Sequence, residues 1–235
     1  MERDIEALAK YPTESDDWII TVAIGGVAAM LSFLIVPIFV VSGYLVRALR
    51  AGMEGAEEPP VFDDWGELIT EGFMAAVISL IYQIVPLIVF TVFVLGSLLA
   101  LLTGSEAGAG LGIVGFIGSF LAWWVLSLLF GYVGFAGVAN YAREGSFGAG
   151  FDVDVIKTTV LSREYAVAWL WVVALNIVAG VVTSMLNIIP FLGAIVGVFV
   201  SFYALVIAGW LWGDGFAAAT GGTSEPDTGA DPVTA

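Results

Sequence analysis

The longest uncharged segment of the chain is YAVAWLWVVALNIVAGVVTSMLNIIPFLGAIVGVFVSFYALVIAGWLWG, residues 165–213. A helix needs about 20 apolar residues to cross the hydrocarbon core of a bilayer. These 49 residues contain no Asp, Glu, Lys or Arg, so they predict two membrane spans, over about 165–188 and 191–212, with a hinge around Pro190. The chain is therefore expected to be an integral membrane protein.

Three further segments are free of charged residues, namely 18–46, 72–105 and 107–142. They predict spans over about 18–46, 72–102 and 110–141, with kinks at Pro37 and Pro86. Hydrocarbon offers no hydrogen-bond partners, so the backbone N–H and C=O groups of these segments must bond to one another. At this length they do so by forming helices. The expected fold class is all-α: a polytopic helical membrane protein with about five transmembrane helices and short interfacial helices, forming one membrane domain over 18–213.

The flanking segments are polar. Residues 1–17 lack the basic start and prompt apolar core of a cleavable signal peptide, so the first apolar segment is expected to be retained. Residues 214–235 are expected to form a disordered acidic tail, because they cannot bury enough apolar surface to become ordered. Short interfacial helices are expected after Asp64, with Asp64 and Glu67 as a capping box, and within 143–164.

The chain is strongly acidic, with 22 acidic and 7 basic residues and a net charge of −15. Molar salt screens repulsion within such a surface, so the balance predicts adaptation to a salty cytoplasm; the alternative is an acidic protein of an ordinary cell. Nucleic-acid binding is not expected, since it needs clustered basic residues. With five spans, the first loop, the third loop and the C-terminus share a side and hold five basic residues, which predicts that this side is cytoplasmic. The N-terminus then lies outside, unless the first segment or the stretch 165–213 is miscounted, in which case it lies inside.

Few residues offer chemistry. The chain has no His and no Cys, and its uncharged segments hold no ionisable group of the kind that marks proton relays. We therefore expect no enzymatic activity, no cofactor and no bound metal. The sequence Gly110-x-Gly112-x-x-Gly115 matches a dinucleotide fingerprint only formally, because no strand precedes it. The amides of Gln83, Asn140, Asn176 and Asn187 are expected to join helices, and a polar cavity near Gln83, Asn176 and Asn187 would favour a carrier.

A weak internal repeat is also present. Gly43-Tyr44 and Phe62-Asp63 have counterparts at Gly134-Phe135 and Phe151-Asp152, with offsets of 91 and 89 residues. This pattern predicts a duplicated two-span unit, although helical membrane proteins in general show a similar alternation of apolar spans and polar loops. Glycines spaced three or four apart over 108–137 predict close helix packing, either within the chain or in a homo-oligomer.

A set of candidate family-motif and interface residues accompanies Tyr11-Pro12, namely Asp16, Asp17, Trp18, Pro37, Gly43, Tyr44, Arg47, Arg50, Pro59, Pro60, Phe62, Asp63, Asp64 and Trp65. With these residues the chain resembles a known family, the domain of unknown function 4013 (DUF4013), whose members are frequent in halophilic archaea. The resemblance covers about residues 8–215. It implies a multi-pass protein of an archaeal plasma membrane and implies no activity.

The expected function is a non-enzymatic structural, scaffold or membrane-homeostasis role. The alternative is a small permease or channel component for a neutral or lipidic solute. The expected partners are the lipid bilayer and either further copies of the chain or other membrane proteins.

Overall fold

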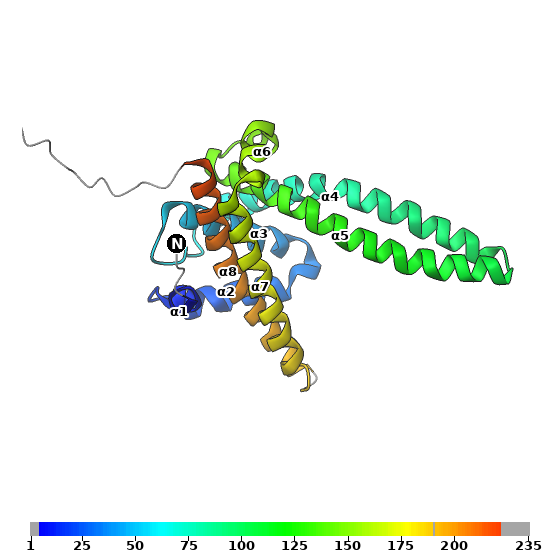
Figure 1. Cartoon of the computed structure of the whole chain (residues 1–235). Coiled ribbons are helices and arrows are strands. Elements are labelled where there is room, and N and C mark those ends of the chain that lie inside the picture. Colours follow the sequence, from blue (N-terminus) through cyan, green and yellow to red (C-terminus); the bar gives the residue numbers. More distant parts are fainter. Residues whose placement is uncertain (1–4, 190, 222–235) are drawn as a thin grey trace, which may run out of the picture.

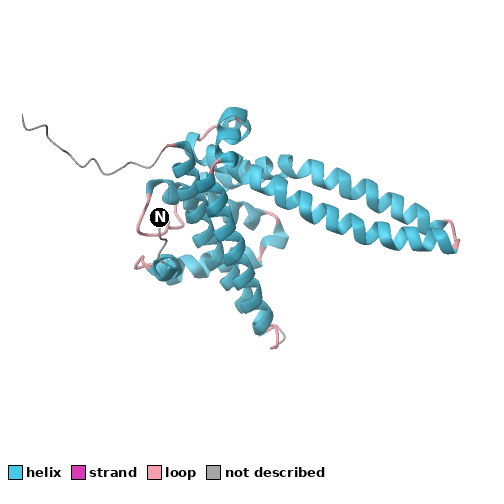
Figure 2. Cartoon of the chain, viewed as in Figure 1, coloured by secondary structure: helices cyan, strands magenta, loops and turns pink. Residues whose placement is uncertain are grey.

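Helices make up nearly all of the computed structural model, which describes residues 5–189 and 191–221. Their bounds are α1 (Ile5–Lys10), η1 (Tyr11–Thr13), α2 (Trp18–Met30), η2 (Ser32–Leu34), α3 (Val36–Glu54), α4 (Trp65–Leu102), α5 (Glu106–Glu144), η3 (Phe147–Phe151), α6 (Val153–Leu161), α7 (Arg163–Leu186) and α8 (Leu192–Thr220). The described residues contain no strand, and short loops join the helices (Figure 2). Five helices, α3, α4, α5, α7 and α8, are long and apolar enough to cross a membrane. The predicted fold class is confirmed.

Two long antiparallel hairpins dominate the molecule. The first joins α4 to α5 through residues 103–105, where Gly104 takes a left-handed φ of 67° and Ser105 Oγ accepts a hydrogen bond from the Gly108 amide at 3.0 Å. The second joins α7 to α8 through the turn predicted around residue 190. The two hairpins leave a common base in different directions, so their far ends lie well apart (Figure 1).

The core lies in this base, which we define as the adjoining ends of α3, α4, α5, α7 and α8 together with the loop 55–64 and α6. Tyr44 and Leu49 of α3, Tyr165 of α7 and Phe202 and Phe216 of α8 are almost completely buried there. Away from the base the hairpins expose rows of Leu, Ile, Val and Phe side chains. Such an apolar surface suits hydrocarbon, so the fold is ordered by packing at one end and by lipid elsewhere.

The first apolar segment differs from the single helix predicted over 18–46. The chain breaks at residues 31–35, where Ile35 takes a left-handed φ of 69°, and Pro37 stands near the start of α3 rather than at a kink. Proline suits a first helical turn because the missing amide hydrogen is not needed there. In addition, α3 continues beyond residue 46 to Glu54 and so includes Arg47 and Arg50.

The break reverses the chain direction. Along α2 the contacts with α8 run in descending order, since Gly25 faces Phe202 and Gly26 faces Phe199. Along α3 they run in ascending order, since Ala48 faces Gly209 and Leu49 faces Gly213. The N-terminal segment consequently lies beside the loop that follows α3, where the Tyr11 hydroxyl donates to the Glu58 carbonyl oxygen at 3.2 Å. A single span over 18–46 would have placed these two segments on opposite sides of the membrane.

Other boundaries also differ from the predictions. Helix α4 begins at Trp65 and runs unbroken through Pro86 to Leu102, so no separate interfacial helix precedes the span. The helix predicted within 143–164 is present as α6. The predicted tail begins too early, because α8 continues to Thr220, with Phe216 and Ala217 buried in the base. Residues 222–235 lie outside the described residues, so disorder there stays a prediction.

Close contact between α3 and α8 yields the first testable prediction. A Cβ atom at Gly213 would lie 2.0 Å from the carbonyl oxygen of Leu49, so Gly213→Ala must push the two helices apart. We expect a loss of about 1–3 kcal/mol in the free energy of unfolding, the usual cost of overpacking. Thermal unfolding in mild detergent at molar salt would measure it.

The matched control is Gly118→Ala in α5, where a Cβ would meet no atom within 4 Å. Since Ala has the higher helix propensity, by about 1 kcal/mol, this variant should melt at the wild-type temperature or slightly above it. Equal melting of the two variants would contradict the described contact of α3 with α8.

Candidate functional site

A buried ion pair joins three helices at the base. Arg50 of α3 places Nη1 2.5 Å from Oε1 of Glu71 in α4, and its Nε donates to the carbonyl oxygen of Ala142 in α5 at 2.7 Å. The Glu71 side chain is only 9% exposed, whereas that of Arg50 is 33% exposed. An arginine can make such contacts simultaneously because its guanidinium presents five donors in a fixed plane.

A second arginine organises the end of α5. The Arg143 Nη2 atom donates to Oδ1 of Asn140 at 2.7 Å, and the buried Asn140 donates through Nδ2 to the carbonyl oxygen of Ala149 in η3 at 2.8 Å. The guanidinium also lies 5.1 Å from the centre of the Phe216 ring of α8, within range of a cation–π contact. Arg143 thereby links α5 to η3 and α8.

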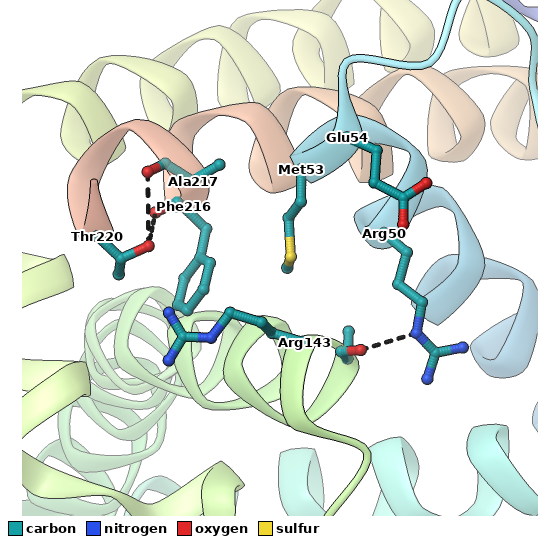
Figure 3. A pocket seen from close by; sticks show the side chains of 8 residues that line it. Arg50, Met53, Glu54, Arg143, Phe216, Ala217 and Thr220 are labelled. Atoms are coloured by element: carbon teal, nitrogen blue, oxygen red, sulfur yellow. Dashed lines mark hydrogen bonds between the residues drawn. The ribbon is translucent and has the colours of Figure 1, made fainter. Parts of the chain in front are cut away.

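Between these two arginines lies a small cavity of about 240 Å³. Figure 3 shows Arg50 and Arg143 on its lower side, with Met53 and Glu54 of α3 and Phe216 of α8 completing the walls. The Arg50 guanidinium is turned toward the Ala142 carbonyl, and the Arg143 guanidinium toward the Phe216 ring. Since both cations are already engaged within the chain, the cavity serves first as part of the structural base.

The loop 55–64 is bound to the end of α3 by the side chains of the predicted motif. The Tyr44 hydroxyl donates to the carbonyl oxygen of Pro60 at 2.9 Å. The Arg47 Nη1 atom donates to the carbonyl oxygen of Val61 at 3.1 Å and also pairs with the Asp63 carboxylate. These bonds satisfy backbone groups of an irregular segment that has few partners of its own.

Aromatic packing holds the same loop. The Phe62 ring stacks on Tyr44 at 4.6 Å and also faces Trp65 at 5.9 Å and Phe202 of α8 at 6.1 Å between ring centres. Phe62 is thus the point where α3, α4 and α8 are joined through one side chain.

The N-terminal segment completes the assembly. The Tyr11 ring packs against Trp210 of α8 with centres 5.7 Å apart, and the Trp210 Nε1 atom donates to the carbonyl oxygen of Ala56 at 3.0 Å. Burial raises the pKa of the Tyr11 hydroxyl above its ordinary value, so this group remains a donor at neutral pH. Pro59 is buried nearby, in keeping with its place in the motif.

The remaining motif residues have separate positions. Asp16 and Asp17 are exposed, and Asp17 makes no side-chain capping bond to α2, which begins at the partly exposed Trp18. Gly43 lies directly against the Leu68 carbonyl of α4. The predicted capping box at Asp64 is absent, because this residue takes a left-handed φ of 37° and makes no side-chain bond to the start of α4. The structure therefore unites most of the motif around the loop 55–64 and leaves Asp16 and Asp17 outside it.

Sequence reasoning missed Glu71 as a member of the base, because this residue directly precedes the uncharged segment 72–105 and no local pattern shows that it is buried. Of the amides expected to join helices, Asn140 links α5 to η3 and Gln83 links α4 to α5. Asn176 and Asn187 instead donate to carbonyl groups of their own helix, so the prediction is wrong for these two.

In the described part of the chain no three acidic residues gather closely enough to hold a metal ion. The arrangement of Arg50 and Arg143 anchors helix ends to one another through charged and polar contacts.

Together the apolar hairpins and the charged base define a multi-pass α-helical membrane protein. A family model described as "Protein of unknown function (DUF4013)" matches residues 30–188, which is more than half of the chain. The chain belongs to this family. No curated protein and no solved structure matches it.

The ion pair yields a second prediction. Replacing Glu71 with Ala leaves Arg50 at the junction of three helices without its carboxylate. Breaking a fully buried pair costs about 3–5 kcal/mol, and since water reaches one third of Arg50 we expect about 1–3 kcal/mol here. Thermal unfolding in detergent would measure the loss.

The control is Glu144→Ala, which removes a 52%-exposed partner of Arg143. An exposed pair contributes at most about 1 kcal/mol, so this variant should unfold almost as the wild type does. If Glu71→Ala proved as harmless as Glu144→Ala, the Arg50 junction would not hold the base together.

Proposed function

We propose that this protein is a non-enzymatic scaffold of the membrane, with a role in organising neighbouring proteins and lipids. One observation carries the proposal: the large buried side chains of the described residues gather mainly at a charged base, while the long hairpins expose apolar side chains over most of their length. In α5 only 6% of the most apolar part is buried, and in α4 and α7 only 11%. Helices that bury so little within their own chain have their surface available to lipids and other membrane proteins.

The distribution of charge supports one orientation. The described basic residues all lie in or beside the base: Lys10, Arg47, Arg50, Arg143, Lys157 and Arg163. The three far turns, 31–35, 103–105 and 187–191, contain no Lys or Arg. Because the N-terminal segment joins the base, its Lys10 adds to the other five, which sharpens the asymmetry on which positive-inside reasoning rests. The base and the N-terminal segment are thus assigned to the cytoplasm.

The cytoplasmic face would then be acidic as well as basic. Glu54, Glu57 and Glu58 are exposed around the loop 55–64, and Glu54 lines the cavity of Figure 3. Such a surface stays soluble at high salt, in keeping with the plasma membrane of a salt-adapted archaeal cell. An acidic, well-ordered loop also provides a defined docking surface for a partner with a complementary basic surface.

Other functions receive less support. The polar groups of the base are largely engaged with one another, as the pairing of Arg50 with Glu71 and of Arg143 with Asn140 shows.

A cavity of about 410 Å³ is lined by Gln83 and Asn176, two of the residues around which a carrier cavity was expected, but Asn187 is not among its lining residues and its wall is mostly apolar. A permease needs a polar route through the bilayer, whereas the surfaces of α4, α5 and α7 are mainly apolar. The ordered loop and the splayed hairpins favour a scaffold.

The test is purification of the full chain in mild detergent at moderate salt, with mass spectrometry of the co-eluting proteins. We expect the triple variant Glu54→Gln, Glu57→Gln, Glu58→Gln to retain at most about one third of the partner that the wild type retains. The reason is that each exposed ion pair contributes roughly 0.2–1 kcal/mol to binding. The control Glu14→Gln, Asp16→Asn, Asp17→Asn removes the same charge outside the loop and should retain the partner.

Two findings together would contradict the scaffold proposal. A preparation with no bound partner, whose proteoliposomes pass an osmolyte faster than empty vesicles do, would overturn the scaffold and establish the permease.

A further inference from the structure

The hairpin formed by α2, the turn 31–35 and α3 is too short to cross a bilayer. Helix α2 has 13 residues, or about 20 Å at a rise of about 1.5 Å per residue, and the exposed Asp17 directly precedes it. On the other arm only 47 − 36 = 11 residues, about 17 Å, separate Val36 from Arg47, which is bound to the loop 55–64. The hydrocarbon core is about 30 Å thick. The turn therefore stays short of the far side of the membrane.

The contacts between α3 and α4 show the same shortfall. Gly43 lies against the Leu68 carbonyl, and four residues back along α3 the Phe39 carbonyl lies against Gly72. In this antiparallel register Ile35 is level with about residue 76 of α4. Helix α4 continues for a further 102 − 76 = 26 residues, about 39 Å, and Figure 1 shows the turn between α2 and α3 far short of that end. This remainder of α4 alone exceeds the thickness of the hydrocarbon core.

The side chains of the turn are apolar and exposed. Phe33 is 76% exposed, Leu34 is 55% exposed and Ile35 is 63% exposed. The segment 18–46, which contains the turn, has no charged residue. Transfer of such a surface from water to an apolar environment is favourable. Acyl chains therefore suit this turn better than water does.

The backbone of the turn also suits hydrocarbon. The turn contains the short 3-10 helix η2, in which the Leu34 amide donates to the Leu31 carbonyl oxygen at 2.9 Å. The Ile35 amide donates to the Ser32 carbonyl oxygen at 3.1 Å. Pro37 stands in the first turn of α3, where amide hydrogens lack partners within the helix, and proline has no amide hydrogen to satisfy. Local 3-10 bonding of this kind allows a helix to break within a membrane.

We propose that α2 and α3 form a re-entrant hairpin, which enters the bilayer from the side of the base and places the turn 31–35 among the acyl chains of that leaflet. The hairpin then returns to the same side. Of the five helices that are long and apolar enough to cross a membrane, α3 is the one that does not cross.

The hairpin anchors the loop 55–64 at the membrane surface, because Tyr44 and Arg47 of α3 bind this loop. This role goes beyond the scaffold function, since it requires no protein partner. A failure to co-purify a partner would overturn the scaffold and leave the expected depth of the turn unchanged.

The test measures the depth of the turn in sealed proteoliposomes that contain the full chain. We expect a membrane-impermeant maleimide to leave Phe33→Cys unmodified from either side, and to modify it once sodium dodecyl sulfate has unfolded the chain. When Phe33→Cys carries the permeant fluorophore monobromobimane, its fluorescence should be lost to phosphatidylcholine with a nitroxide on its acyl chain. Aqueous iodide should leave the fluorescence unchanged.

Two exposed positions serve as controls, Glu57→Cys in the loop 55–64 and Ser105→Cys in the turn between α4 and α5. Both should react with the impermeant maleimide, each from one side and the two from opposite sides. Leu34→Cys repeats the measurement at a second position of the turn, should Phe33→Cys fail to fold.

Three results would overturn the proposal. Reaction of Phe33→Cys from the side of Ser105→Cys would show that the hairpin crosses the membrane. Reaction from the side of Glu57→Cys, with quenching by iodide, would place the turn in water. Protection from maleimide, iodide and nitroxide lipid alike would show that protein covers the turn, either a second copy of the chain or a partner.

Discussion

The exclusion of charge from hydrocarbon is the constraint on which the rest of this structure depends. An ionised side chain within the bilayer is costly, and an unpaired backbone group is costly as well. The chain meets both demands with long helices whose charged residues gather at one end. Helix ends, the loop 55–64 and α6 therefore meet in one base. The far turns are short, and Glu106, which directly follows residues 103–105, is the only charged residue beside them. Order within the base then determines how the hairpins leave it.

Within the base, a few side chains connect segments that are distant in sequence. Arg50 joins α3 to α4 and α5, Phe62 joins the loop to α3, α4 and α8, and Tyr11 joins the N-terminal segment to the same loop. These contacts replace the broad helix-to-helix packing of a closed bundle. The hairpins can therefore diverge, and a cavity of about 410 Å³, lined by residues of α4, α5, α7 and α8, lies between them.

Much of this arrangement could be predicted from the sequence, because uncharged runs of at least 20 residues and the turn near residue 190 have direct physical signals. The break at residues 31–35 could not, because the sequence is apolar on both sides and the reversal depends on contacts of Gly25 and Gly26 with α8. The burial of Glu71 could not be predicted either, because it depends on the position of Arg50 in the neighbouring helix α3. Gln83 and Asn176 line one cavity because of how the two hairpins pack, which no local pattern specifies. The internal repeat stays a prediction, and its second unit contains α6 where the first has an irregular loop.

The central claim is that α2 returns the N-terminal segment to the face that carries the loop 55–64. Since the chain has no native cysteine, single substitutions Asp16→Cys, Glu57→Cys and Ser105→Cys can each be labelled cleanly with a membrane-impermeant maleimide in sealed vesicles. The structure predicts that Asp16→Cys and Glu57→Cys react from the same side and Ser105→Cys from the opposite side. Reaction of Asp16→Cys and Glu57→Cys from opposite sides would restore a single span over 18–46 and contradict the account.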